Sequence, residues 1–436
     1  MKFNHYKQKN FDFSLGILHS QPQIPDDSHI DAGLGGALDR FRPLKLSECS
    51  DSTPRYYAPC QARSIKHAVV AEELIYPAFS LNAPIFATSR PHDVEKWWNS
   101  TWKLSDRAHR NGNEVRYPEK HGQLFVFENV TLSSSTPFDE WGTPACMSIN
   151  VPTSFVEPSN KPPTHDTVLL ANVGDSWSLQ HFLDRAMRVV GQAHTFQATN
   201  IATGRKSSPS VRDMWSMLGY APDKMIHKNT NFVASKLIWS CRAPMAHPWL
   251  IRRLISLLHP NSLSGLPVAE RKTVMYMTRS NGITLNGGRK VQNEDLLLLE
   301  IRKLLDRRGE GEVLQVFNHN DFANMSTLMK YFHHNVKAII GPHGGALHHH
   351  LWTGPDTLVV EFLPISRPDL TFFETVKLRE QLYAVLMVES LDDEHNMRIE
   401  IPAVIQILEE RLGKGATKND TFRAVYDWEA EELHVV

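Results

Sequence analysis

The chain has 436 residues, of which 41% are hydrophobic and 22% charged, and its formal net charge is −1. Such a length predicts two domains. The nearly neutral net charge argues against nucleic-acid binding. The sequence contains no apolar run of about 18 residues, so it predicts no membrane-spanning helix.

Residues 1–60 are rich in Pro, Gly, Ser and Asp without a period, which predicts an irregular lead-in. This lead-in contains no apolar core of signal-peptide type. We therefore expect a cytoplasmic protein or a chain whose targeting segment is missing. Cys49 and Cys60 could close a small loop in an oxidising compartment, but free thiols in a cytosolic protein fit equally well.

Residues 61–245 are expected to form an N-terminal domain. Short apolar runs between turn residues indicate strands from about 65 to 130, and residues 131–165 are typical of a long surface loop. The run "TVLLANVG" (167–174) predicts a buried strand, and "SLQHFLDRAMRVVGQA" predicts the helix that follows it.

Residues 246–400 are expected to form a C-terminal domain, because apolar strands alternate there with helices. "HPWLIRRLISLL", "NEDLLLLEIRKLLDRR", which Asn293 can cap, and "DFANMSTLMKYFHH" predict the helices. "TVMYMT", "VLQVF", "VKAIIG" and "TLVVEFLP" predict the strands. This alternation predicts an α/β fold with a Rossmann-like parallel sheet covered on both faces. Residues 401–436 predict one helix and a tail.

A glycine-rich loop, "GPHGGALHHHLW", follows one of these strands. Ligands of open parallel sheets bind beyond the carboxyl ends of the strands, and the amides at a helix start attract anions. Gly341, Gly344 and Gly345 could therefore cradle a phosphate, with His343 adding a hydrogen bond. A tight turn whose glycines serve only the backbone angles is an equally good interpretation.

Charged residues near this loop favour a nucleotide. Glu361 lies inside the apolar run "LVVEFLP", where it could accept the hydroxyls of a ribose or form an ion pair. Arg279, followed by Ser280, ends the strand "TVMYMT", and Arg289 closes the next loop. Two arginines there would neutralise a diphosphate.

The ordered set "YMTRS", "RKVQNED", "IIGPHGGAL" and "VVEFLP" resembles glycosyltransferase family 61. A weaker match is "NVGDSWSLQHFLDRAMRV", where the family has a His-aromatic motif on a helix. The family loop usually runs His-Gly-Ala-Gly-Leu-x-Asn. Here the small residues are exchanged, and His349 replaces the Asn.

The resemblance implies a GT-B architecture, in which two Rossmann-like domains face a central cleft. A UDP-sugar, with GlcNAc or xylose, would bind the C-terminal domain, and a glycan or glycoprotein acceptor the N-terminal one. Transfer would invert the anomeric carbon without a metal or another cofactor, and no Asp-x-Asp occurs in the sequence. The family also implies the Golgi or ER lumen, with membrane attachment only through an anchor that this chain does not contain.

Inverting transfer needs a base, for which we expect His181, followed by Asp184, Asp166 and His165. A helix histidine packed in the core is an equally good interpretation of His181. His343 is expected to assist the departing diphosphate.

Three other functions compete with this interpretation. His348, His349 and His350 suggest a metal, but consecutive helical residues diverge too far to chelate one ion. Ser176 after a strand, with Asp392 and His395, could form the triad of a GDS-type esterase. The third is a GT-B scaffold that binds nucleotides without catalysis.

Overall fold

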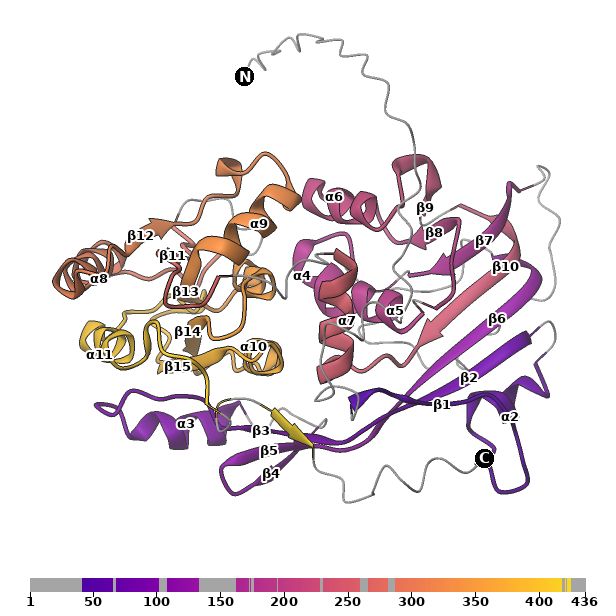
Figure 1. Cartoon of the computed structure of the whole chain (residues 1–436), viewed down its shortest axis with the longest axis horizontal. Helices are drawn as coiled ribbons and strands as arrows, with labels where there is room; N and C mark the ends of the chain where they lie inside the picture. Colours follow the sequence, from indigo (N-terminus) through magenta and orange to yellow (C-terminus); the bar gives the residue numbers. More distant parts are fainter. Residues whose placement is uncertain are drawn as a thin grey trace, which may run out of the picture.

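The computed structural model describes residues 41–65, 68–101, 108–132, 162–171, 173, 176–193, 195–227, 230–258, 266–280, 287–417, 420 and 422–424. Most of the expected surface loop 131–165 lies outside these ranges. Within them, no helix is long and apolar enough to cross a membrane. The described chain is an α/β fold built on two sheets that contain parallel strands (Figure 1).

The first sheet has seven strands and mixed directions. Its order is β1-β2-β6-β10-β7-β8-β9. The β10, β7, β8 and β9 strands run parallel, whereas β1, β2 and β6 pair in antiparallel fashion. The strands span Leu44–Leu46 (β1), Ala68–Tyr76 (β2), Lys120–Leu132 (β6), Thr164–Leu170 (β7), Asn200–Thr203 (β8), Met225–His227 (β9) and Phe232–Cys241 (β10).

Helices cover the face of this sheet that is turned toward the second half of the chain (Figure 1). The helix expected after β7 is present, but it is divided by one π-helical stretch. Its parts are α4 (Leu179–His181), the π-helix η3 (Phe182–Ala186) and α5 (Met187–Gln192). Two more helices on this face are α6 (Pro209–Met217) and α7 (Pro248–Leu258), and a 3₁₀ turn, η4, spans Pro222–Lys224.

The second sheet is entirely parallel, as its apolar strands predict. Its order is β12-β11-β13-β14-β15. The strands span Thr273–Tyr276 (β11), Val313–Val316 (β12), Val336–Pro342 (β13), Leu358–Pro364 (β14) and Leu382–Val388 (β15).

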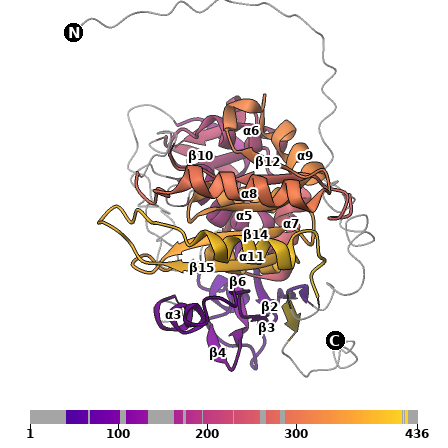
Figure 2. The same ribbon diagram turned by 90° about the vertical axis from the view of Figure 1, so that its left-hand side faces the viewer.

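Helices cover both faces of the second sheet. The outer face carries α8 (Glu294–Arg308) and α11 (Ile401–Arg411), which lie in front of the sheet in Figure 2. The inner face, toward the first half, carries α9 (Met325–Asn335), α10 (Thr371–Leu378) and the 3₁₀ helix η6 (Gly345–Trp352) (Figure 1). A 3₁₀ turn, η5 (His319–Asp321), precedes α9.

Two helices differ from the sequence prediction at their N-termini, α9 in its first residue and α8 only in its cap. The α9 helix begins only at Met325, because the Asn324 side chain accepts a hydrogen bond from the Thr327 amide and so caps the helix there. The Asn293 side chain makes no capping bond to α8. It instead exchanges two hydrogen bonds with the backbone of Ile399.

The two halves are connected by exchanged segments. After α11 the chain returns to the first half, where β16 (Phe422–Ala424) pairs with β3 (Phe79–Asn82) in a small sheet. In the other direction, Ile85 forms a parallel bridge with Ala384 of β15. The helix α3 (His92–Ser100) packs against β15. The small sheet also contains β4 (His109–Asn111) and β5 (Glu114–Tyr117).

One hydrophobic core extends across both halves. It contains Phe182 and Met187 from the first half together with Phe332, Trp352 and Phe373 from the second. Successive side chains of the second sheet's strands point to opposite faces. One set packs in this shared core, and the other packs in an outer core under α8 and α11. The helices between the two sheets are therefore the place where residues of both halves meet.

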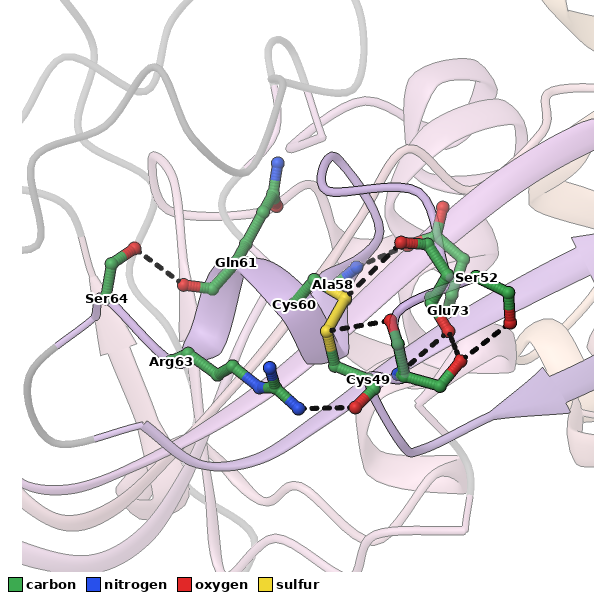
Figure 3. The surroundings of a disulfide bond; sticks show 10 residues. Cys49, Ser52, Ala58, Cys60, Gln61, Arg63, Ser64 and Glu73 are labelled. Atoms are coloured by element: carbon green, nitrogen blue, oxygen red, sulfur yellow. Dashed lines mark hydrogen bonds between the residues drawn. A yellow bond between two sulfur atoms is a disulfide. The ribbon is translucent and has the colours of Figure 1, made fainter.

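A disulfide joins Cys49 and Cys60 (Figure 3), so of the two interpretations of these cysteines the paired one is correct. Cys241 is disulfide-bonded as well, and no described cysteine is a free thiol. Regular structure surrounds this disulfide, because β1 lies just before Cys49 and Cys60 lies in α2 (Ala58–Ala62). The segment expected to be an irregular lead-in thus contributes to the first sheet from residue 44 onward.

Candidate functional site

Two predicted arginines meet after β11. The Arg279 guanidinium donates hydrogen bonds to the carbonyl oxygens of Gly288 and Gly287, at 2.9 and 3.1 Å. Arg279 is 8% exposed and Arg289 5% exposed. Burial, then the charges of Arg279 and Arg367, lower the pKa of Arg289 to about 10. Burial, then the charge of Arg367, also lowers the pKa of Arg279. Two guanidinium groups lie close together here, an arrangement that favours a bound anion.

The glycine-rich loop packs closely against the Arg279 side chain and against the strand before it. A Cβ atom on Gly344 would lie 2.5 Å from a terminal nitrogen of Arg279, so a larger residue would displace the guanidinium. A Cβ atom on Gly341 would lie 2.8 Å from the carbonyl oxygen of Met277, which explains glycine where β13 passes β11. The glycines are therefore required by close packing at the edge of the sheet.

His343 and Glu361 form a buried pair. Nδ1 of His343 lies 2.6 Å from Oε1 of Glu361, and the Tyr383 hydroxyl donates to the other carboxylate oxygen. Glu361 is fourth of the seven residues of β14 and only 1% exposed, so it is paired rather than placed at an open strand end. It shares the inner face with Val359 and Leu363, which belong to the core between the halves. The pair therefore faces the helices of the first half.

His181 and Asp184 form a second pair, on the helix of the first half. Nδ1 of His181 lies 3.3 Å from Oδ2 of Asp184. A carboxylate can only accept, so this contact directs the Nδ1 proton of a neutral His181 toward Asp184 and makes Nε2 the nitrogen of the ring that can accept a proton. Asp184 sits in the π-helix η3, and such π-helical turns are frequent at functional sites.

The structure brings the two pairs into one region. The α4 helix, which contains His181, contacts η6, which begins directly after Gly344. A Cβ atom on Gly345 would lie 3.3 Å from the side-chain oxygen of Gln180 in α4. The predicted residues His181, Asp184, Arg279, Arg289, Gly341, His343, Gly344, Gly345 and Glu361 therefore gather where the inner helices of the two halves meet.

Ser280 is exposed, and its amide donates to the Thr278 hydroxyl. It directly precedes residues 281–286, which lie outside the described ranges. Its predicted role in nucleotide binding stays a prediction.

Other predicted residues lie elsewhere. His165 and Asp166 are near the start of β7, at the opposite end of that strand from α4, so they cannot serve a site beside η6. The esterase triad is not assembled: Nδ1 of His395 contacts the Ser366 hydroxyl at 2.8 Å, whereas the buried Ser176 hydroxyl has no hydrogen-bond partner in the described structure.

Sequence reasoning missed several residues of this region. Arg367 and Asp369 follow the carboxyl end of β14, and both act electrostatically on Arg289. Phe372 of α10 contacts the rings of His343 and His348, with centroids 5.3 and 4.7 Å apart. The sequence could have indicated Arg367 and Asp369, because they follow a predicted parallel strand and ligands bind at the carboxyl ends of such strands. Nothing in the sequence near Phe372 indicates its contacts.

Metal ligation has no candidate in the part of the chain that the structure describes. No group of three or more His, Cys, Asp or Glu side chains is arranged there to hold an ion. The three consecutive histidines lie in a 3₁₀ helix, where neighbouring side chains point about 120° apart. This spacing agrees with the argument that they cannot share one ion.

The comparison with protein families gives a match. Residues 146–360 match the family model described as Glycosyltransferase 61. The matched range contains both arginines, the glycine-rich loop and the His181–Asp184 pair, and it ends one residue before Glu361. No curated protein matches the chain.

Proposed function

We propose, from the membership of this chain in glycosyltransferase family 61, that it is an inverting transferase for UDP-sugars. The donor sugar would be GlcNAc or xylose, and the acceptor a hydroxyl group of a glycan or glycoprotein. The observation that carries this proposal is the convergence of three arginines, Arg279, Arg289 and Arg367, near the His343–Glu361 pair at the carboxyl-end side of a parallel sheet. A diphosphate needs such fixed positive charge when it departs.

The arginines have distinct parts in this proposal. Arg279 is held by two backbone carbonyls and packs against Gly344, so it offers a fixed charge at the start of the glycine-rich loop. Arg289 is buried beside it, and Arg367 is exposed. The first two would bind the diphosphate, and Arg367 would add charge from the solvent side. Glu361 would hold His343 in one orientation by accepting the proton of its Nδ1, and in the imidazolium form of the ring Nε2 would donate to a phosphate oxygen.

The His181–Asp184 pair would supply the base. The acceptor oxygen attacks the anomeric carbon while the bond from that carbon to the diphosphate oxygen breaks, which inverts the configuration. The hydroxyl proton passes to Nε2 of His181, and the negative charge of Asp184 stabilises the imidazolium that forms. No metal takes part in this scheme.

The proposed architecture is GT-B. Residues 61–245 would bind the acceptor and residues 246–400 the donor, with 1–60 as a lead-in and 401–436 as a return to the first half. The two sheets with a shared core between their inner helices support this arrangement. The Cys49–Cys60 disulfide and the family support the lumen of the secretory pathway as its location.

Nucleotide binding is the first test. We would measure the melting temperature with UDP, GDP, CMP and ADP, each with and without EDTA, for the wild type and for Arg279→Ala. A ligand at about 100 times its Kd stabilises the folded state by about 2.7 kcal/mol. We expect stabilisation by UDP, unaffected by EDTA, absent in Arg279→Ala and retained in Arg302→Ala, which removes an exposed arginine of α8.

Turnover is the second test. UDP release from UDP-GlcNAc and UDP-xylose should fall at least about a hundredfold in His181→Ala. Stabilisation by UDP without any UDP release would support the non-catalytic binding scaffold. No stabilisation of a folded sample by any of the four nucleotides would refute the proposed function.

A further inference from the structure

The three consecutive histidines of η6 lie in three different environments. His348, His349 and His350 are all fully buried. Side chains in a 3₁₀ helix point about 120° apart, so neighbours contact different parts of the protein, whereas residues three apart share one face. Each histidine can therefore be assigned from its own contacts.

His350 and His349 have structural surroundings. Both ring nitrogens of His350 are hydrogen-bonded, to Gln381 and Thr375, each at 2.9 Å. The His349 ring packs between Phe317 and Phe332, with centroids 4.9 and 5.4 Å away. Both ring nitrogens of His350 therefore have hydrogen-bond partners. The His349 ring packs like an aromatic side chain in the core between the halves.

His348 has a different environment. It is 1% exposed, and neither ring nitrogen has a hydrogen-bond partner in the described structure. Its ring lies against Phe372, which also contacts His343. His348 is three residues after Gly345 and so shares the face of η6 that approaches Gln180 of α4. It thus lies between the diphosphate residues and the His181–Asp184 pair.

Two unpartnered ring nitrogens are unfavourable at such a position. A buried donor without a partner loses its hydrogen bonds to water and gains nothing in return. Leu or Phe would fill this space without that loss. The charged and titratable groups that interact with His348 include Asp184, His343, Asp369 and His181 of the candidate site, besides its neighbours His349 and His350. The missing partner is therefore best sought among the substrates.

We propose that His348 hydrogen-bonds a hydroxyl group of the sugar being transferred and contributes to donor selection. This inference rests on the proposed function, because it assigns a residue to the same site. The ring lies at the contact of α4 and η6, which is where the sugar must lie if the diphosphate binds Arg279 and the base is His181. Because the ring is only 1% exposed, the proposal requires side chains at this contact to move when the sugar binds.

A set of three leucine substitutions tests the proposal. We would measure the melting temperature, its shift with UDP, and the KM and kcat for UDP release from UDP-GlcNAc and UDP-xylose. His348→Leu should melt at or above the wild-type temperature and keep the shift with UDP. Its donor KM should rise about tenfold, the equivalent of one lost hydrogen bond, and its preference between the two donors should change.

The neighbouring histidines are the controls. His349→Leu should retain the wild-type KM for both donors. His350→Leu should melt at a lower temperature, because Gln381 and Thr375 lose their partner. His348→Asn, which keeps one donor and one acceptor, should recover part of the wild-type KM and covers the case in which the leucine variant does not fold.

Two outcomes would overturn the inference. A wild-type KM and donor preference in both His348 variants would show that the ring makes no contact with the sugar. A KM for His349→Leu raised as much as that for His348→Leu would indicate a general disturbance of η6. Failure of UDP to stabilise the wild type would instead remove the proposed function itself, so the two failures are distinguishable.

Discussion

Burial of His349 predicts how the stability of this protein depends on pH. Burial is the main cause that lowers the pKa of His349 to about 3, and the nearby His319 and His348 lower it further. In the unfolded chain a histidine has a pKa of about 6.5. Below that pH the unfolded state binds a proton that the folded state does not bind. The contribution of His349 is therefore complete above about pH 6.5 and is lost as the pH falls from there toward 3.

The size of the effect follows from the same two pKa values. At pH 5 the unfolded histidine is about 1.5 pH units below its pKa, while the folded one is still neutral. Proton binding by the unfolded state alone therefore lowers the free energy of unfolding by about 2 kcal/mol at pH 5. His349→Leu removes the group, so its free energy of unfolding should fall by about 2 kcal/mol less than that of the wild type between pH 7.5 and pH 5.

Urea-induced unfolding at the two pH values, followed by tryptophan fluorescence, measures this difference. Any change in packing caused by leucine is present at both pH values and cancels in the comparison. His109→Leu, a change of an exposed histidine in β4, is the matched control. If the wild type and His349→Leu lose the same free energy between pH 7.5 and pH 5, the assignment of a buried, neutral His349 is wrong.

Three further substitutions test other parts of the structure. Gly344→Ala should abolish stabilisation by UDP with little change in the melting temperature of the free protein, since the new Cβ atom displaces Arg279; unchanged UDP binding would contradict the close packing. Lys337→Met should destabilise the fold by roughly 1.5–3 kcal/mol in urea unfolding, because it removes one charged hydrogen-bond partner of the buried Glu312, which keeps its ion pair with Arg308; a loss below about 1 kcal/mol would contradict this. Cys49→Ser opens a disulfide between cysteines 11 residues apart and should cost about 3 kcal/mol; equal unfolding midpoints with and without reductant would refute that contribution.

Local patterns were sufficient for four of the five strands of the second sheet, but they did not predict β15 or the α10 helix before it. The alternation of apolar strands and helices predicts β11 to β14 and their parallel direction, because a buried parallel strand must be apolar on both faces. The glycine-rich loop and the arginines could be connected from the sequence for a related reason. The carboxyl ends of parallel strands meet at one edge of the sheet, so residues after different strands become neighbours.

Only the tertiary structure decided how the two halves meet. The sequence predicts one helix after β7 but contains no signal for the π-helix that holds Asp184, since such turns depend on packing. The exchange of Ile85 and β16 between the halves, and the different surroundings of His348, His349 and His350, depend on contacts between residues far apart in the chain. Local periodicity shows which side of a helix is buried, but it does not show what the buried side contacts. Identical residues in a row therefore take different parts once the fold sets their neighbours.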